Sequence, residues 1–171
     1  TLSEEKVTGY NTNAKVNPPL RTRRDIAALI KGLKDNTIDA IATDHSPHTT
    51  ADKLCEFDSA AFGISGFETA LGSLMSLVHS GDLDLITLIS KLTIEPARVI
   101  GVSCTLKVGA SADITIFDPE AEWVVKPQSF LSKGKNTPLA GDLLKGKVMA
   151  TIVRGVMVYK DESIKVYSEV F

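Results

Sequence analysis

A short apolar run at residues 38–43, Ile-Asp-Ala-Ile-Ala-Thr, constrains the fold of this chain more than any other feature. It follows a segment from Thr22 to Lys34 whose apolar residues recur at helical spacing, with Thr22 suited to the N-cap. A short, mostly apolar strand is typical of a parallel sheet covered on both faces. We therefore expect an α/β fold in which 38–43 is a buried strand.

The predicted strand leads directly into Asp44, His45 and His48. Active sites of parallel α/β folds assemble at the carboxyl ends of strands. An aspartate there can bind a divalent metal through one oxygen and accept a proton through the other. The alternative interpretation is that Asp44 caps a loop, His45 points back to the sheet and His48 faces solvent. The pattern Asp-His-x-x-His alone does not separate the two.

The chain divides into a helical part and a β-rich part. Residues 49–65 form a long irregular stretch of the kind that is usually functional, and we expect 49–62 to be mobile without a ligand because no periodic pattern holds it. Apolar spacing then predicts helices from Phe67 to Val78 and from Leu85 to Leu92, and Pro96 can start a short helix through Val99.

Beyond Gly101 the pattern favours strands. Residues 112–117 and 123–125 are extended runs, and 151–159 predicts a hairpin that turns at Arg154-Gly155. We place a boundary near residue 100, so that 1–100 is an α/β part and 101–171 a small β-rich domain.

Composition excludes several classes of partner. The formal charge of 19 basic and 21 acidic residues is -2, which gives no general affinity for nucleic acid or an anionic membrane. No apolar run reaches the roughly 18 residues that span a bilayer. Cys55 and Cys104 stand about fifty residues apart without a metal-binding pattern, which indicates reduced thiols. We expect a cytoplasmic protein with a small-molecule substrate.

Four stretches together resemble a known family: Lys-Val-Asn-Pro-Pro-Leu-Arg at 15–21, Asp-His-Ser-Pro-His at 44–48, Phe-Gly-Ile-Ser-Gly-Phe-Glu-Thr-Ala at 62–70 and Lys-Gly-Lys-Asn-Thr-Pro-Leu at 133–139. In this order they resemble the carboxyl-terminal part of a dihydroorotase of the bacterial class I type, within the zinc-dependent amidohydrolase superfamily. The resemblance implies the C-terminal part of a (β/α)8 TIM barrel plus a small β-sandwich segment. It also implies one or two zinc ions and the interconversion of carbamoyl-aspartate and dihydroorotate in pyrimidine synthesis.

The resemblance assigns roles to five residues. Asp44 would bind zinc and act as general acid and base, while His48 and Asn17 would hydrogen-bond the substrate. The backbone of Phe62 and Gly63 would contact the substrate ring. His45 matches the motif but receives no catalytic role.

Two positions depart from the family pattern, and several family residues are absent. Ser46 stands where the family usually has Ala, and Gly72 where Pro is usual; both lie outside the chemistry. Asp44 is the one matched zinc ligand, whereas a zinc site needs about four. About 100 residues precede the β-rich part, and a barrel takes roughly 250. We therefore expect the last two or so βα units of a longer enzyme.

Three further expectations follow from this interpretation. The chain alone neither binds zinc tightly nor turns over substrate. Its partner is the remaining amino-terminal portion or a second copy, and aspartate carbamoyltransferase is a further candidate partner. The alternatives are a related cyclic-amide hydrolase, such as an allantoinase or dihydropyrimidinase, and a non-catalytic dihydroorotase-like structural subunit.

Overall fold

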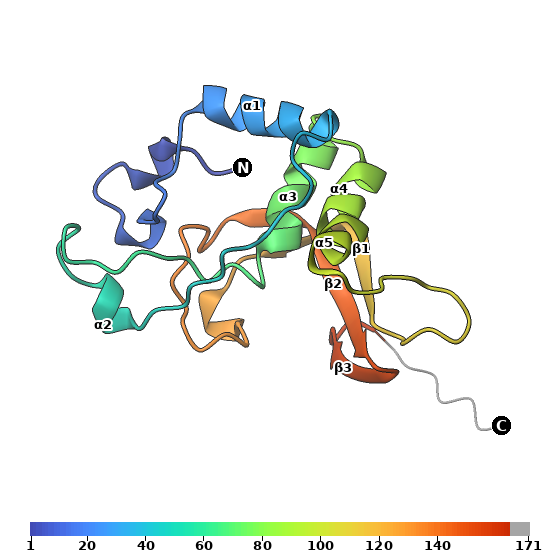
Figure 1. Ribbon diagram of the computed structural model, residues 1–171. Helices are drawn as coiled ribbons and strands as arrows, with labels where there is room; N and C mark the ends of the chain where they lie inside the picture. The colour runs from blue at the N-terminus through green and yellow to red at the C-terminus, as the bar shows by residue number, and fades with distance from the viewer. Residues whose placement is uncertain (165–171) are drawn as a thin grey trace.

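The computed structural model describes residues 1–164, with helices before residue 101 and strands after it (Figure 1). The last seven residues of the predicted 101–171 domain lie outside the described residues. The helices are α1 (Arg23–Lys34), α2 (Thr50–Lys53), α3 (Ala70–His79), α4 (Leu85–Leu92) and α5 (Ile94–Ile100). The strands are β1 (Ile114–Val124), β2 (Leu143–Val153) and β3 (Val156–Lys160), and short 3-10 turns occupy Glu4–Val7, Thr12–Ala14 and Pro127–Ser129.

The helix predicted from Thr22 is confirmed as α1. Its first turn is fixed by a capping box, in which the Thr22 hydroxyl accepts from the Asp25 amide at 3.2 Å and the Asp25 carboxylate accepts from the Thr22 amide at 3.0 Å. The predicted helices at 85–92 and around Pro96 are confirmed as α4 and α5. The helix expected from Phe67 begins at Ala70, because residues 67–69 form a turn.

The strand predicted at residues 38–43 is wrong for this chain. The segment is extended, but no described residue pairs along it, and Ala42 and Thr43 are exposed. It is held instead by α1 and α4: the Ile38 amide donates to the Gly32 carbonyl at 2.9 Å, and the buried Lys91 ammonium donates to the Ile38 carbonyl at 2.7 Å. A strand requires a neighbouring strand for its backbone hydrogen bonds, and residues 1–164 offer this segment none.

The β-rich part forms a three-stranded antiparallel sheet of order β1-β2-β3. The two extended runs predicted at 112–117 and 123–125 belong to one bulged strand, β1. The hairpin at Arg154-Gly155 is confirmed, and both residues have the positive φ of such a turn, 50° and 79°. The described residues form this single sheet, so they supply one layer and not both layers of the expected sandwich.

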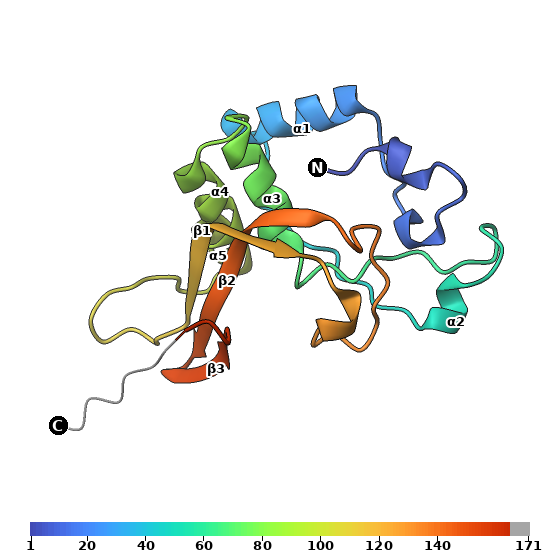
Figure 2. The same cartoon turned by 180° about the vertical axis from the view of Figure 1, so that it is seen from behind.

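Helix α3 lies directly on β2, as both views show (Figures 1 and 2). A Cβ on Gly72 would lie 3.1 Å from the Gly146 carbonyl oxygen, and one on Gly146 would lie 2.6 Å from Met75 Cγ. Met75 is fully buried in a core with Leu33 and Leu88. Glycine at both positions therefore allows the close packing of helix and sheet. The domain boundary near residue 100 stays a prediction, and no helix within residues 1–164 could cross a membrane.

Candidate active site at the Asp44–His48 turn

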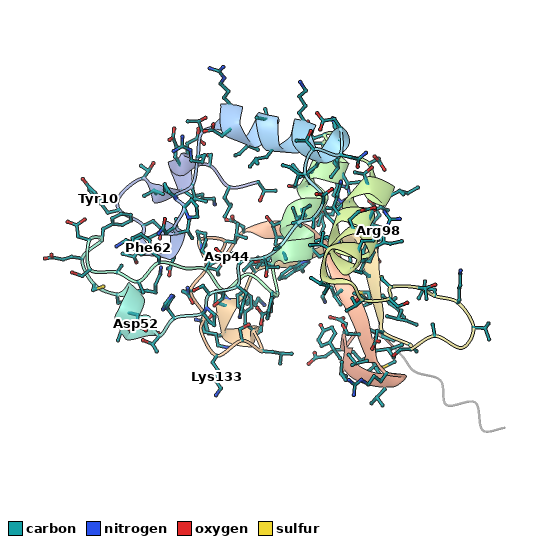
Figure 3. All side chains as sticks on the ribbon, in the orientation of Figure 1. Tyr10, Asp44, Asp52, Phe62, Arg98 and Lys133 are labelled. Carbon is teal, nitrogen blue, oxygen red and sulfur yellow. The ribbon has the colours of Figure 1, made fainter. Side chains whose placement is uncertain are left out.

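Asp44 occupies a special backbone conformation at the start of this turn. Its φ is 47°, in the left-handed region that aspartate tolerates better than most residues. The side chain is exposed, and its carboxylate has no hydrogen-bond partner within residues 1–164. Figure 3 shows Asp44 on the segment that crosses the middle of the molecule. Such backbone strain is concentrated at functional sites, and this carboxylate is accessible to an external group.

His45 is engaged within the fold. Its Nδ1 accepts hydrogen bonds from the Gly66 amide at 3.1 Å and from the Phe67 amide at 3.3 Å, so Nδ1 carries no proton. The ring stacks on Phe67 with centroids 3.8 Å apart. These contacts explain why residues 67–69 form a turn before α3, and they give His45 a structural task beside Asp44.

His48 meets Phe62, a residue from a different motif. The His48 Nε2 lies 2.8 Å from the Phe62 carbonyl oxygen. Because a carbonyl oxygen can only accept a hydrogen bond, the hydrogen of this bond lies on Nε2. The next residue, Gly63, has φ 146°, and a Cβ there would lie 2.4 Å from Ser46 Oγ. The structure thus brings the Asp44–His48 turn against Phe62 and Gly63, with His48 in contact with Phe62 and Ser46 against Gly63.

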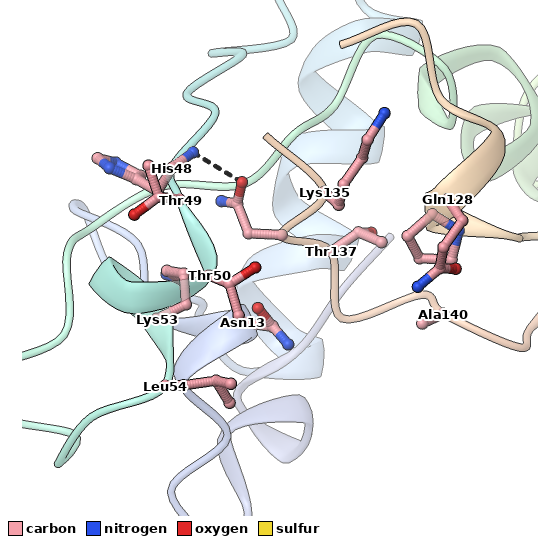
Figure 4. A pocket seen from close by; sticks show the side chains of 12 residues that line it. Asn13, His48, Thr49, Thr50, Lys53, Leu54, Gln128, Lys135, Thr137 and Ala140 are labelled. Carbon is pink, nitrogen blue, oxygen red and sulfur yellow. Dashed lines mark hydrogen bonds between the residues drawn. The ribbon is translucent and has the colours of Figure 1, made fainter. Parts of the chain in front are cut away.

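Asn17 and Asp44 are not joined to that group. Asn17 is exposed, and within residues 1–164 neither side chain hydrogen-bonds to His48, Phe62 or Gly63. An open pocket of about 260 Å³ adjoins the turn on the side of His48 and Lys53 (Figure 4). Asp44 does not line this pocket. The pocket therefore does not contain the Asp44 carboxylate.

Two buried lysines hold the loop that leads to Gly63. Lys15 donates to the carbonyls of residues 57 and 58 at 2.6 and 2.9 Å, and its ammonium lies 4.4 Å from the centre of the Phe62 ring. Lys53 donates to the carbonyls of Ala61 and Gly63 at 2.7 and 3.1 Å. Burial lowers the pKa of Lys53 from its usual value, and the neighbouring Lys15 adds to this effect.

These lysine contacts contradict the premise of one expectation from the sequence, while the expected mobility of residues 49–62 itself stays a prediction. The premise that little holds residues 49–62 is wrong, because four ammonium–carbonyl hydrogen bonds fix that segment or its neighbour Gly63. Sequence reasoning missed both lysines because a lysine within a polar stretch is usually exposed. It also gave no separate role to Asn136, which it noted only within the motif 133–139; that amide is buried against the turn.

Residues 1–164 do not supply a complete metal centre. They contain no group of three or more His, Cys, Asp or Glu side chains placed to hold a metal ion. A catalytic zinc uses about three protein ligands with a water in the fourth position. The exposed, unpaired carboxylate of Asp44 fits one ligand of such a centre, and the remaining ligands would have to come from outside the described residues.

Comparison with known proteins places the chain in a family. Residues 3–158 match the sequence model of the amidohydrolase family. The chain therefore belongs to the amidohydrolase family. It is homologous to dihydroorotases: it is 54% identical over 163 residues to the dihydroorotase of Thermoanaerobacter sp. (strain X514), which covers 95% of this chain and 38% of that enzyme. The chain thus spans less than half the length of this relative.

Solved structures agree on the fold. An L-hydantoinase (dihydropyrimidinase) from Arthrobacter aurescens superposes with a TM-score of 0.86 at 28% identity, over 96% of this chain and 38% of that one. The inactive dihydroorotase-like domain of a Chaetomium thermophilum CAD-like multifunctional protein superposes with a TM-score of 0.62 at 21% identity, over 91% and 40%. The chain is therefore a mixed α/β fold that matches part of these larger proteins.

Proposed function

We propose that this chain supplies the carboxyl-terminal part of a dihydroorotase, which cyclises carbamoyl-aspartate to dihydroorotate and reverses that reaction. The observation that carries the proposal is the 54% identity to the Thermoanaerobacter dihydroorotase over 163 of 171 residues. A stretch that long contains all five candidate site residues. In this proposal the helices and the 38–43 segment are the last units of a (β/α)8 barrel, and 38–43 becomes a paired strand when its neighbours are present.

Asp44 is the proposed general acid and base. Ring closure requires a proton to leave the attacking ureido nitrogen, and the departing carboxylate oxygen takes up that proton and one from solvent and leaves as water. The exposed Asp44 carboxylate can take the first proton and deliver it to the oxygen. His48 and Asn17 hydrogen-bond the substrate, and the backbone at Phe62 and Gly63 lies against its ring. Zinc, held by Asp44 together with ligands from elsewhere in the enzyme, would supply electrostatic stabilisation of charge on the reacting oxygen.

We also propose that the chain acts with a partner. Large apolar side chains stay exposed, among them Ile86 at 82% and Leu106 at 80%. Monomeric proteins rarely leave extended apolar surface uncovered. The proposed partner is the amino-terminal portion of the enzyme, with a second copy of this chain or an aspartate carbamoyltransferase as further partners. The proposed location is the cytoplasm.

Two other functions remain as outcomes of the test. A hydantoinase-type activity is supported by the TM-score of 0.86 to the Arthrobacter enzyme, but the identity to it is 28% against 54% for a dihydroorotase. A non-catalytic role is supported by the likeness to the inactive Chaetomium domain. The accessible Asp44 carboxylate favours the catalytic proposal over the structural one.

A hybrid enzyme tests the proposal. The portion of the Thermoanaerobacter dihydroorotase that this chain does not cover is co-produced with this chain, and the purified complex is assayed with zinc. We expect dihydroorotate hydrolysis and no hydrolysis of hydantoin or allantoin. Hydantoin hydrolysis instead would support the second function, and a stable zinc-loaded complex without any activity would support the third.

A further inference from the structure

One buried amide, Asn136, connects the two segments that carry three of the candidate substrate-binding residues, His48, Phe62 and Gly63. Its Oδ1 accepts from the His48 amide at 2.8 Å and from Ser65 Oγ at 2.9 Å; the dashed line at His48 in Figure 4 marks the first bond. Its Nδ2 donates to the Ser46 carbonyl at 3.2 Å and to the Gly63 carbonyl at 3.0 Å. These four bonds occupy both donors and both lone pairs of a carboxamide that is 5% exposed.

The backbone around Asn136 is packed just as closely against the same segments. A Cβ on Gly134 would lie 2.6 Å from the His48 amide nitrogen, so no larger residue fits there. The Ser65 hydroxyl has one proton, which is shared between Asn136 Oδ1 and the Gly134 carbonyl, 2.9 and 2.8 Å from Oγ, and the Ser65 amide donates to the Asn136 carbonyl at 2.8 Å. The 134–136 segment is therefore fixed on both sides and cannot shift to relax a lost side-chain bond.

The Asn136 bonds reach the atoms that decide where a substrate would sit. The bond to the His48 amide fixes the backbone from which the imidazole reaches the Phe62 carbonyl. The bond to the Gly63 carbonyl, shared with Lys53, fixes the next peptide. Both carbonyls that flank the Gly63 Cα are thereby held, one through His48 and one through Asn136. The two segments are also joined by the Ser46 amide bond to the Ile64 carbonyl at 2.9 Å and by the bonds of the Gly66 and Phe67 amides to His45, but none of these reaches His48, Phe62 or Gly63.

We propose that Asn136 is a positioning residue of the substrate site: it sets the distance between His48 and the Phe62–Gly63 backbone without touching the substrate. This inference rests on the proposed function and deepens it. It also assigns to the β-rich part a direct share in the site, since Asn136 lies beyond the predicted boundary near residue 100. The amide is suited to this task because it presents two donors and two acceptor lone pairs on one short, planar side chain.

The test uses the hybrid enzyme with two variants of Asn136 and one control. Asn136→Ala removes all four bonds, whereas Asn136→Asp keeps an acceptor for the His48 amide but places a second oxygen against the Ser46 and Gly63 carbonyls. Thr137→Val is the matched control, because Thr137 is 2% exposed and, among residues 1–164, its hydroxyl accepts from the Leu139 amide alone.

We expect Asn136→Ala to raise KM for dihydroorotate roughly tenfold or more, with a smaller change in kcat, since the loss falls on substrate placement. Hydrogen exchange of the His48 amide, followed by mass spectrometry, should accelerate in Asn136→Ala and stay near wild type in Asn136→Asp. Thr137→Val should leave both readouts unchanged. If Asn136→Ala does not fold, Asn136→Asp and Ser65→Ala carry the kinetic test, with raised KM expected in each.

Unchanged KM together with unchanged His48 exchange would overturn the proposal, and so would an equal rise of KM in Thr137→Val. An unmodified hybrid that does not hydrolyse dihydroorotate would refute the proposed function instead. In that case hydrogen exchange still decides whether Asn136 holds the turn, so the two failures are distinguishable.

Discussion

Replacement of Asp44 by Asn separates catalysis from folding better than any other change at this site. The left-handed φ of 47° is tolerated by asparagine as well as by aspartate, and the side chain is exposed without a partner in residues 1–164. We therefore expect Asp44→Asn to alter the free energy of unfolding by less than about 0.5 kcal/mol. Alanine tolerates a left-handed φ less well, so Asp44→Ala should lower the free energy of unfolding by about 1–2 kcal/mol.

The effect on catalysis should be far larger. A general acid and base contributes about 10²–10⁴-fold, which corresponds to roughly 2.7–5.4 kcal/mol in the activation barrier. The assay is dihydroorotate hydrolysis by the hybrid enzyme, with zinc content measured in the same samples. A variant that keeps its zinc and near-normal kcat would refute the role of Asp44 in proton transfer. Equal loss of stability in the Asn and Ala variants would refute the backbone argument.

The remaining predictions concern the chain by itself. After gel filtration it should hold less than stoichiometric zinc and show no dihydroorotate hydrolysis; elemental analysis with full zinc and activity would contradict this. Sedimentation equilibrium should find it associated, since a stable monomer of 18.4 kDa would show that its exposed apolar surface needs no partner. Lys147 and Ser163 lower the pKa of Asp161 from 3.8 to about 2. Because the folded pKa is depressed, Asp161 should stabilise the fold by up to about 2 kcal/mol above pH 4, and this is lost as pH falls through 2. Denaturant titrations of wild type and Asp161→Asn should therefore differ at pH 7 and converge near pH 2.

Local patterns predicted those elements that local interactions create. Thr22 and Asp25 close the capping box of α1 within three residues, and Arg154-Gly155 forms the hairpin turn from its own backbone preferences. The strand at 38–43 was predicted from composition alone, but a strand is a property of two segments, and residues 1–164 contain no neighbour for it. The composition of residues 38–43 indicates that the segment would form a strand beside a sheet. It does not indicate whether that sheet is present.

In the candidate site, too, features that depend on local sequence could be predicted and long-range contacts could not. The turn at Asp44 and the glycine at 63 could be recognised from short motifs, whereas the groups that hold them could not. The Lys15 ammonium reaches a carbonyl 42 residues away, and Asn136 reaches the His48 amide across 88. Such contacts require a knowledge of the tertiary fold, because a buried lysine or asparagine has no local sequence pattern to distinguish it from an exposed one.

The separation of 88 residues between His48 and Asn136 also determines when their hydrogen bond can form during synthesis. A ribosome adds about 5–20 residues per second, so the turn emerges roughly 4–18 seconds before the amide that binds it. Throughout that interval the backbone amide of His48 must be satisfied by water. A chain terminated before residue 136 would carry every candidate substrate-binding residue and lack the side chain that joins His48 to Gly63. The contact between the turn and Asn136 therefore forms only after residue 136 has been made.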